Sequence, residues 1–335
     1  MASDLPEQHQ ALVLEDREAG FELKTLSTPQ PGPGSAIILI ESAGILPYHH
    51  QVIRHYPIPI PLVGGFSAIG RIAAIGPDAV ALQLGQLVYV DCVIHARDDP
   101  DEFFLSAVIE GFTDGSKKLM RDVWRDGTFA EYFKAPLENC IPLNENRLCK
   151  ELGYSIPELT YMAYLLVPYG GLRDIKLEPG ETIVICPATG GYSGAAVQVA
   201  LSMGARVIAM ARNGEKLAKL KEHVEKTSPG ANLETVLITG DESNDAAALR
   251  AFGTIDAALD LTPSTAATSA HTKRKMMYDR PDILQLIKML ERGLFSRGTN
   301  FVDVKTFALG DWKQGLDTAA DHVGIGKCAV FVPRA

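Results

Sequence analysis

The chain has 335 residues, enough for two domains of ordinary size, and it is 46% hydrophobic and 22% charged, as globular proteins are. A chain of this size can bury a large core without disulfides or metals. It carries 32 lysines and arginines against 41 acidic residues, a net charge of −9. This balance argues against a nucleic-acid partner, because binding phosphates along a duplex needs a positive field.

The sequence also predicts a compartment. Residues 1–6 lack the basic-then-apolar pattern of a signal peptide, and no apolar run approaches the ~18 residues of a membrane span. The chain ends in residues 333–335, Pro-Arg-Ala, which match no retention signal. The odd number of cysteines and the lack of a C-x-x-C pair favour buried thiols over a disulfide or zinc framework. We therefore expect a cytosolic protein that neither enters nor binds a membrane, with free thiols at Cys92, Cys140, Cys149, Cys186 and Cys328.

The first 150 residues have the pattern of a β-rich domain. Short apolar runs at 36–40, 70–75 and 86–90 are separated by turns rich in Pro and Gly. Strands at this spacing predict a small barrel or sandwich. The polar stretch 97–125 holds an acidic cluster at 98–102, and we interpret it as a solvated surface excursion.

The pattern changes near residue 155, where strand and helix signals begin to alternate. A helix is expected at 157–167. The alternation of strands and helices that follows it predicts a parallel sheet flanked by helices. A further helix at 281–292 and a strand, helix and strand within 301–332 complete the chain. The alternating strands are expected at 181–186, 205–210, 235–238 and 255–260, and the helices between them at 195–203, 215–225 and 245–252.

One loop of this second region has the pattern of a phosphate site. The apolar run 183–186 leads into a glycine-rich turn that opens a helix. Glycines let the backbone approach a diphosphate, and a helix N-terminus supplies free N–H groups. The strict G-x-G-x-x-G is absent, although Thr189, Gly191 and Gly194 fit T-x-G-x-x-G. A plain strand-to-helix turn remains the alternative. The predicted coenzyme-binding residues are Thr189, Gly190, Gly191, Tyr192, Ser193 and Gly194.

The end of the next strand indicates which coenzyme binds. An acidic residue there would bind the ribose hydroxyls of NAD. The strand instead ends Met210-Ala211-Arg212-Asn213, with Lys216 one turn into the following helix. Cations at these positions can pair with a 2′-phosphate, so the sequence favours NADP, unless Arg212 and Lys216 merely face solvent.

Several motifs together give a resemblance to a known family. They are the turn from Gly65 to Gly70, the run 79–90 (AVALQLGQLVYV), the run 127–132 (GTFAEY) and the glycine-rich loop. In combination they resemble the medium-chain dehydrogenase/reductase superfamily over nearly the whole chain. The resemblance implies an α/β fold with a GroES-like β-barrel domain (1–155, completed by 296–335) and a Rossmann-type NADP-binding domain (156–295). It also implies an active site in the cleft between them.

The chain departs from the zinc-dependent members of that family. Their zinc-binding cysteine segment corresponds to residues 43–49 here, and their G-H-E triplet to Gly65-Phe66-Ser67. Leu46 and Phe66 cannot ligate zinc, and the four-cysteine zinc lobe is missing. The sequence therefore predicts no metal. A metal site formed by His49, His50 and His55 is disfavoured, because no carboxylate pattern or cysteine accompanies them.

Chemistry without zinc needs another group at the substrate oxygen. Tyr48 lies where zinc-dependent relatives place a proton-relaying hydroxyl, which makes it the candidate proton donor. One of His49 and His50 could orient the substrate or relay a proton, and His49 is the candidate that we choose. Thr160 resembles the position where family members contact the nicotinamide. Each of these residues could instead serve packing alone.

The second departure is a deletion after residue 260. Relatives continue there with a helix and two strands, whereas this chain has only about 20 polar residues before the segment 276–281, and loops of that length are uncommon in compact domains. We expect a shortened sheet of about four parallel strands and a monomer or an altered dimer. The cluster Lys273-Arg274-Lys275 is by default a solvated basic loop, and the alternative is that it covers the gap.

Two functions follow from these observations. The first is an NADPH-dependent oxidoreductase that reduces an activated C=C or C=O of a small organic substrate, such as a tailoring dehydrogenase of secondary metabolism. The alternative is a non-catalytic dinucleotide-binding relative, because of the lost strands. The gap could also reflect how the gene was translated into sequence.

Overall fold

The computed structural model describes residues 5–261, 278–296 and 301–334, and its chain divides into two compact units. Unit 1 comprises residues 1–160, 304–322 and 328–335, and unit 2 comprises 161–303 and 323–327. The sequence predicts domains at 1–155 with 296–335 and at 156–295. This division into independently folding domains stays a prediction. Among the described residues, no helix is both apolar enough and long enough to cross a bilayer.

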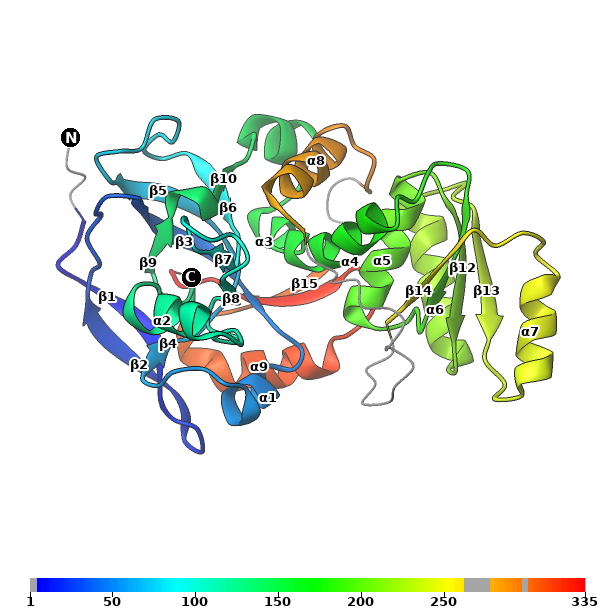
Figure 1. Ribbon diagram of the computed structural model, residues 1–335, viewed down its shortest axis with the longest axis horizontal. Coiled ribbons are helices and arrows are strands. Elements are labelled where there is room, and N and C mark those ends of the chain that lie inside the picture. Colours follow the sequence, from blue (N-terminus) through cyan, green and yellow to red (C-terminus); the bar gives the residue numbers. More distant parts are fainter. Residues whose placement is uncertain (1–4, 262–277, 297–300, 335) are drawn as a thin grey trace. The chain divides into compact units, whose positions relative to one another are not determined.

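Unit 1 is built from antiparallel strands (Figure 1). Its largest sheet has the order β10-β6-β5-β3-β16-β15, with β9 also paired to β3, and a second sheet has the order β2-β1-β4. Its core strand β3 is buried over nearly its whole length, because apolar residues occupy both of its faces. The strands are β1 Gln8–Asp16, β2 Gly20–Ser27, β3 Ser35–Ile45, β4 Leu62–Val63, β5 Ala68–Ile75, β6 Leu87–Val90, β7 Val93–His95, β8 Phe103–Leu105, β9 Tyr132–Pro136, β10 Cys140–Pro142, β15 Asp303–Phe307 and β16 Lys327–Phe331.

Four helices accompany these sheets: α1 His49–His55, α2 Asp114–Asp122, α3 Ile156–Leu159 and α9 Trp312–Asp321. The tail of the chain forms the predicted strand, helix and strand as β15, α9 and β16. Because β16 pairs with β3, the end of the chain returns to the sheet of the first domain.

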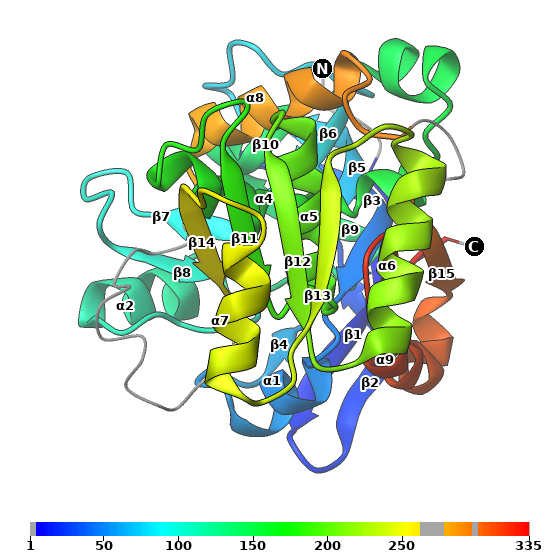
Figure 2. The same cartoon turned by 90° about the vertical axis from the view of Figure 1, so that its right-hand side faces the viewer.

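Among its described residues, unit 2 contains four parallel strands, as predicted from the sequence, in the order β13-β12-β11-β14. Helix α7 packs on one face, against Val184, Ile208, Met210 and Val236, and Figure 2 shows α4 and α5 behind the sheet. Alternate residues of β11 and β12 point to these two faces, and both sets are buried. The strands are β11 Thr182–Cys186, β12 Arg206–Ala211, β13 Leu233–Leu237 and β14 Ala257–Asp260; the helices are α4 Met162–Asp174, α5 Gly191–Ser202, α6 Gly214–Thr227, α7 Glu242–Arg250 and α8 Arg280–Glu291.

The prediction of a solvated excursion at 97–125 is wrong in part. The segment contains β8 and α2, and a capping box formed by Thr113 and Ser116 starts the helix. Glu110 is buried there because Arg121 pairs with it through two hydrogen bonds of 2.7 Å. Charge counts along the sequence do not reveal such a pairing. The predicted cover Lys273-Arg274-Lys275 lies outside the described residues.

Candidate coenzyme site

The glycine-rich loop leads from the carboxyl end of β11 into α5, as predicted. Gly190 is the N-cap of α5, and its N–H donates to Ser193 Oγ at 2.8 Å. The first N–H groups of a helix have no partner within the helix, and they carry the positive end of its dipole. The first turn of α5, which begins at Gly191, can therefore hold an anionic group.

Aromatic stacking holds the start of α5 in place. The Tyr192 ring stacks on Tyr164 of α4 at a centroid distance of 4.9 Å, and Tyr164 stacks on Tyr161 at 5.3 Å. Tyr161 is fully buried, whereas Tyr192 is partly exposed. The stack thus links the first turn of α5 to the core of unit 2.

Gly194 lets the segment 323–327 approach α5 closely. A Cβ atom at Gly194 would lie 2.7 Å from Ile325 Cα and 2.8 Å from its N. Only glycine permits this approach, because both neighbours are backbone atoms. The segment that carries Lys327 is thereby brought to the coenzyme loop.

A pocket of about 220 Å³ lies beside Thr189 of this loop. Three lysines line it, Lys216 and Lys219 from α6 and Lys327 from the start of β16, and none of its described lining residues is acidic. None of these ammonium groups has an ion-pair partner within 5–261, 278–296 and 301–334. Uncompensated cations next to a helix N-terminus suit a phosphate. The other lining residues are Leu220, His223, Val323, Gly324 and Ile325.

The structure brings together only part of the predicted phosphate-binding pair. Asn213 Oδ1 accepts from the Lys216 N–H at 2.9 Å and so starts α6, which directs Lys216 toward the pocket. Arg212 directly follows β12, is exposed and does not line the pocket. Lys219 and His223 were missed, although their spacing from Lys216 places all three on one helix face. Lys327 lies more than 100 residues further along, and no local signal could have linked it to them.

The other predicted site residues belong to unit 1. Thr160 is buried, and its Oγ1 donates to Ser42 Oγ at 2.7 Å. Tyr48 is the half-buried N-cap of α1, with its ring 6.2 Å from that of Tyr56. The roles predicted for Thr160 and Tyr48 stay predictions.

His49 lies in the core of unit 1. Its ring is 5.0 Å from that of Phe129, and its Nδ1 accepts from the Leu46 N–H at 3.3 Å. Burial lowers the pKa of His49 to about 3, with a smaller contribution from His50. The imidazole is therefore neutral near pH 7, and its predicted proton-relay role stays a prediction. His50 instead contacts Asp317 of α9, at 3.0 Å.

His49 should make unit 1 sensitive to acid. The unfolded chain binds a proton on this ring below about pH 6.5, whereas the folded protein does so only near pH 3, so stability falls as the pH drops through that window. Between about pH 7.5 and about pH 5 we expect wild type to lose roughly 2 kcal/mol more unfolding free energy than His49→Asn. Urea unfolding at both values measures this, and parallel pH profiles of the two proteins would contradict it.

The positions that match zinc ligands of relatives are occupied by packing residues. Leu46 is 2% exposed and Phe66 is 4% exposed, with the Phe66 ring against Gly44. Within the described residues no cluster of three or more His, Cys, Asp or Glu could hold a metal ion.

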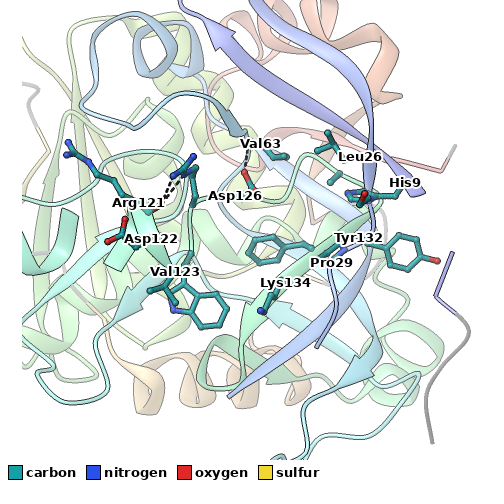
Figure 3. Close-up of a pocket in the computed structure, with 16 residues that line it drawn as sticks. His9, Leu26, Pro29, Val63, Arg121, Asp122, Val123, Asp126, Tyr132 and Lys134 are labelled. Carbon is teal, nitrogen blue, oxygen red and sulfur yellow. Dashed lines mark hydrogen bonds between the residues drawn. The ribbon is translucent and has the colours of Figure 1, made fainter. Parts of the chain in front are cut away.

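A further pocket of about 360 Å³ lies within unit 1, between β1, β9 and the loop after α2 (Figure 3). In it the Lys134 Nζ lies 6.0 Å from the centre of the Trp124 ring. Asp126 Oδ1 accepts from the Val63 N–H at 2.9 Å, which fixes the loop. His9 is 5% exposed, and burial lowers its pKa. Both signs of charge line this pocket, so its electrostatics select no ligand class.

The fold and the loop together define a class of protein, in which an antiparallel β domain is combined with a parallel sheet of the Rossmann type. The family model for the alcohol dehydrogenase GroES-like domain matches residues 32–145. Acryloyl-coenzyme A reductase of Metallosphaera sedula is 26% identical over 224 residues, 66% of this chain and 64% of that protein. Alcohol dehydrogenase 1 of Emericella nidulans is 29% identical over 227 residues, 64% of this chain and 59% of that protein. The chain thus matches less than two thirds of the length of these curated relatives.

Solved structures share the fold over nearly the whole chain. Acetophenone reductase from Geotrichum candidum, in complex with NAD, has a TM-score of 0.68 at 17% identity and covers 98% of each chain. A thermostable alcohol dehydrogenase from Pyrobaculum aerophilum, with cobalt and zinc bound, has a TM-score of 0.64 at 17% identity and covers 97% of this chain and 100% of its own. The family model thus shows a GroES-like domain at residues 32–145, and the solved structures show that the chain has the fold of these dehydrogenases and reductases. In sequence the chain is similar to members of the medium-chain dehydrogenase/reductase family.

Proposed function

We propose that the protein is an NADP-dependent oxidoreductase that acts on an activated C=C or C=O of a small organic molecule. The observation that carries this proposal is the pocket beside Thr189, where Lys216, Lys219 and Lys327 meet without an acidic neighbour among the described residues. NAD needs an acceptor for its ribose hydroxyls at this place, whereas the 2′-phosphate of NADP needs cations. The relatives, named as dehydrogenases and reductases, support the reaction class.

Four groups of residues would have separate roles in binding the coenzyme and in the reaction. The N–H groups at the start of α5 bind the diphosphate, and the three lysines bind the 2′-phosphate. NADPH, when bound, would supply the hydride. Tyr48 donates the proton to the substrate, and Thr160 contacts the nicotinamide. A hydroxyl donor can stabilise charge that develops on a substrate oxygen.

We propose that this reaction proceeds without zinc. Leu46 and Phe66 stand where zinc-dependent relatives have ligands, and neither side chain offers a lone pair to a metal. Metal analysis of the purified protein checks this. Stoichiometric zinc that is lost together with activity on chelation would contradict it.

Titration of the protein with NADPH and NADH, followed by nicotinamide fluorescence, tests the coenzyme assignment. We expect NADPH to bind at least about tenfold more tightly, since two or more charge-assisted contacts are at stake. Equal binding of both coenzymes, or of neither, would refute it. A panel of quinones and enones with NADPH then tests turnover, and a tailoring role in secondary metabolism predicts activity on some of them.

The four-stranded sheet among the described residues favours a second candidate, a dinucleotide-binding relative without catalytic activity. Such a protein would bind NADPH but would not oxidise it with any acceptor. Inserting a helix and two strands of ordinary length after Asp260 separates the two. Activity only in the extended variant supports the second candidate, and turnover by the native chain eliminates it.

We propose a monomer or an altered dimer for the same reason, because family members often pair through strands that follow the position of Asp260, and the sheet of the described residues contains four strands. Sedimentation velocity would show a stable dimer if that proposal is wrong. A cytosolic location rests only on the sequence features described above.

A further inference from the structure

His223 of α6 lies in the wall of the lysine pocket and also lines a second pocket of about 460 Å³ that continues along the helix. Its Cε1 and Nε2 atoms face Gly326, where a Cβ would lie 2.5 Å and 2.8 Å from them. The ring is thus held between α6 and the segment 323–327. His223 is therefore part of the wall of a cationic pocket, a position that the sequence did not predict.

A chain of hydrogen bonds within unit 2 reaches the ring from the other side. The Gly326 N–H donates to Tyr161 Oη at 3.1 Å, and Tyr161 Oη donates to Gln198 Oε1 at 3.0 Å. The amide nitrogen of Gln198 therefore faces His223 Nε2, at 3.3 Å. An NH₂ group can only donate, so Nε2 must accept, and the neutral ring carries its proton on Nδ1.

Burial and nearby cations both disfavour protonation of the ring. Burial lowers the pKa of His223, and Lys226 and Lys327 lower it further. Lys216, Lys219, Glu222 and Lys226 on α6, with Lys327 and Asp303 from the returning chain, are the charged groups that line the two pockets. Nδ1 has no hydrogen-bond partner among the described residues.

We propose that His223 donates from Nδ1 to the coenzyme's 2′-phosphate in the lysine pocket, and that Gln198 and Tyr161 are positioning residues that hold this tautomer. The proposal rests on the proposed function. His223 then contributes, as an uncharged donor, to the selection of NADP over NAD. Its hydrogen bond from a fixed ring is more directional than the attraction of three flexible lysines.

Two substitutions of similar size separate donation from packing. An asparagine amide nitrogen can take the place of Nδ1, whereas a glutamine amide takes the place of Nε2. We expect His223→Gln to weaken NADP⁺ binding about tenfold or more and to leave NAD⁺ binding within about threefold, since a bond to a charged acceptor is lost. His223→Asn should retain most of the NADP⁺ affinity, and Lys221→Gln, an exposed charge removal elsewhere on α6, is the control.

Two further readouts would not respond to a purely structural role. Nitrogen-15 spectra of labelled histidine in wild type should show a protonated Nδ1 and an unprotonated Nε2, and Gln198→Leu should mix the two tautomers. The NADP⁺ affinity of wild type should stay level above about pH 7, because the phosphate is then a dianion and the donor needs no ring charge. A protonated Nε2, or an affinity that falls tenfold per pH unit, would overturn the proposal.

The outcomes distinguish this inference from the function on which it rests. Tight NADP⁺ binding that is equal in wild type and His223→Gln overturns the role of His223 and leaves the coenzyme assignment intact. Wild type that binds neither coenzyme, or both equally, overturns both.

Discussion

Replacing Lys216 with glutamate is expected to weaken NADP⁺ binding by about 100-fold, since it removes a charge-assisted bond and adds repulsion. Lys216 lines the lysine pocket from the first turn of α6, close to Thr189. NAD⁺ binding should stay unchanged or improve, because a carboxylate at this place can accept from the ribose hydroxyls. Titration with both coenzymes measures the two dissociation constants.

Lys221→Glu is the matched control for this experiment. It makes the same charge change on the same helix, but Lys221 is exposed and does not line the pocket. Its effect should stay within about threefold, because salt screens exposed charges beyond roughly 10 Å. If the two variants lose NADP⁺ affinity equally, the effect comes from net charge and the pocket is not the phosphate site.

The sequence predicted the order of the elements in unit 2 because their periodicity is local. The apolar strand 183–186, the glycines that follow and the amphipathic face of α6 can each be recognised within a dozen residues. The four parallel strands are confirmed among the described residues. The expectation of a shortened sheet came from counting residues after Asp260, which again needs no knowledge of packing, and it stays a prediction.

The composition of the pocket could not be predicted in the same way. Lys327 reaches it only because β16 starts there, and Gln198 faces His223 only once α5 and α6 pack together. Arg212 carries the right charge in sequence, yet its side chain is exposed outside the pocket wall. Tertiary contacts between distant segments decide which cations meet in the pocket, and the local sequence pattern does not predict these contacts.

The approach of the segment 323–327 to α5 depends on a single residue, so Gly194→Ala tests how the pocket is assembled. The added Cβ would meet Ile325 Cα at 2.7 Å, closer than non-bonded carbons come, and α5 or the segment must shift. Overpacking of this kind costs about 1–3 kcal/mol. We expect that loss in the free energy of unfolding, measured by urea titration, and a loss of NADP⁺ affinity because Lys327 moves with the segment.

Gly214→Ala provides the comparison within the same unit. Gly214 is the first residue of α6, and a Cβ there would meet only Leu237 Cδ1, at an ordinary contact distance of 3.8 Å. Alanine should therefore be neutral or stabilising by up to about 1 kcal/mol, since it restricts the unfolded chain. A Gly194→Ala protein that matches Gly214→Ala in both stability and coenzyme affinity would show that the segment can move aside freely. In that case Lys327 and the ring of His223 would owe their positions to contacts other than the close packing of α5 against Ile325.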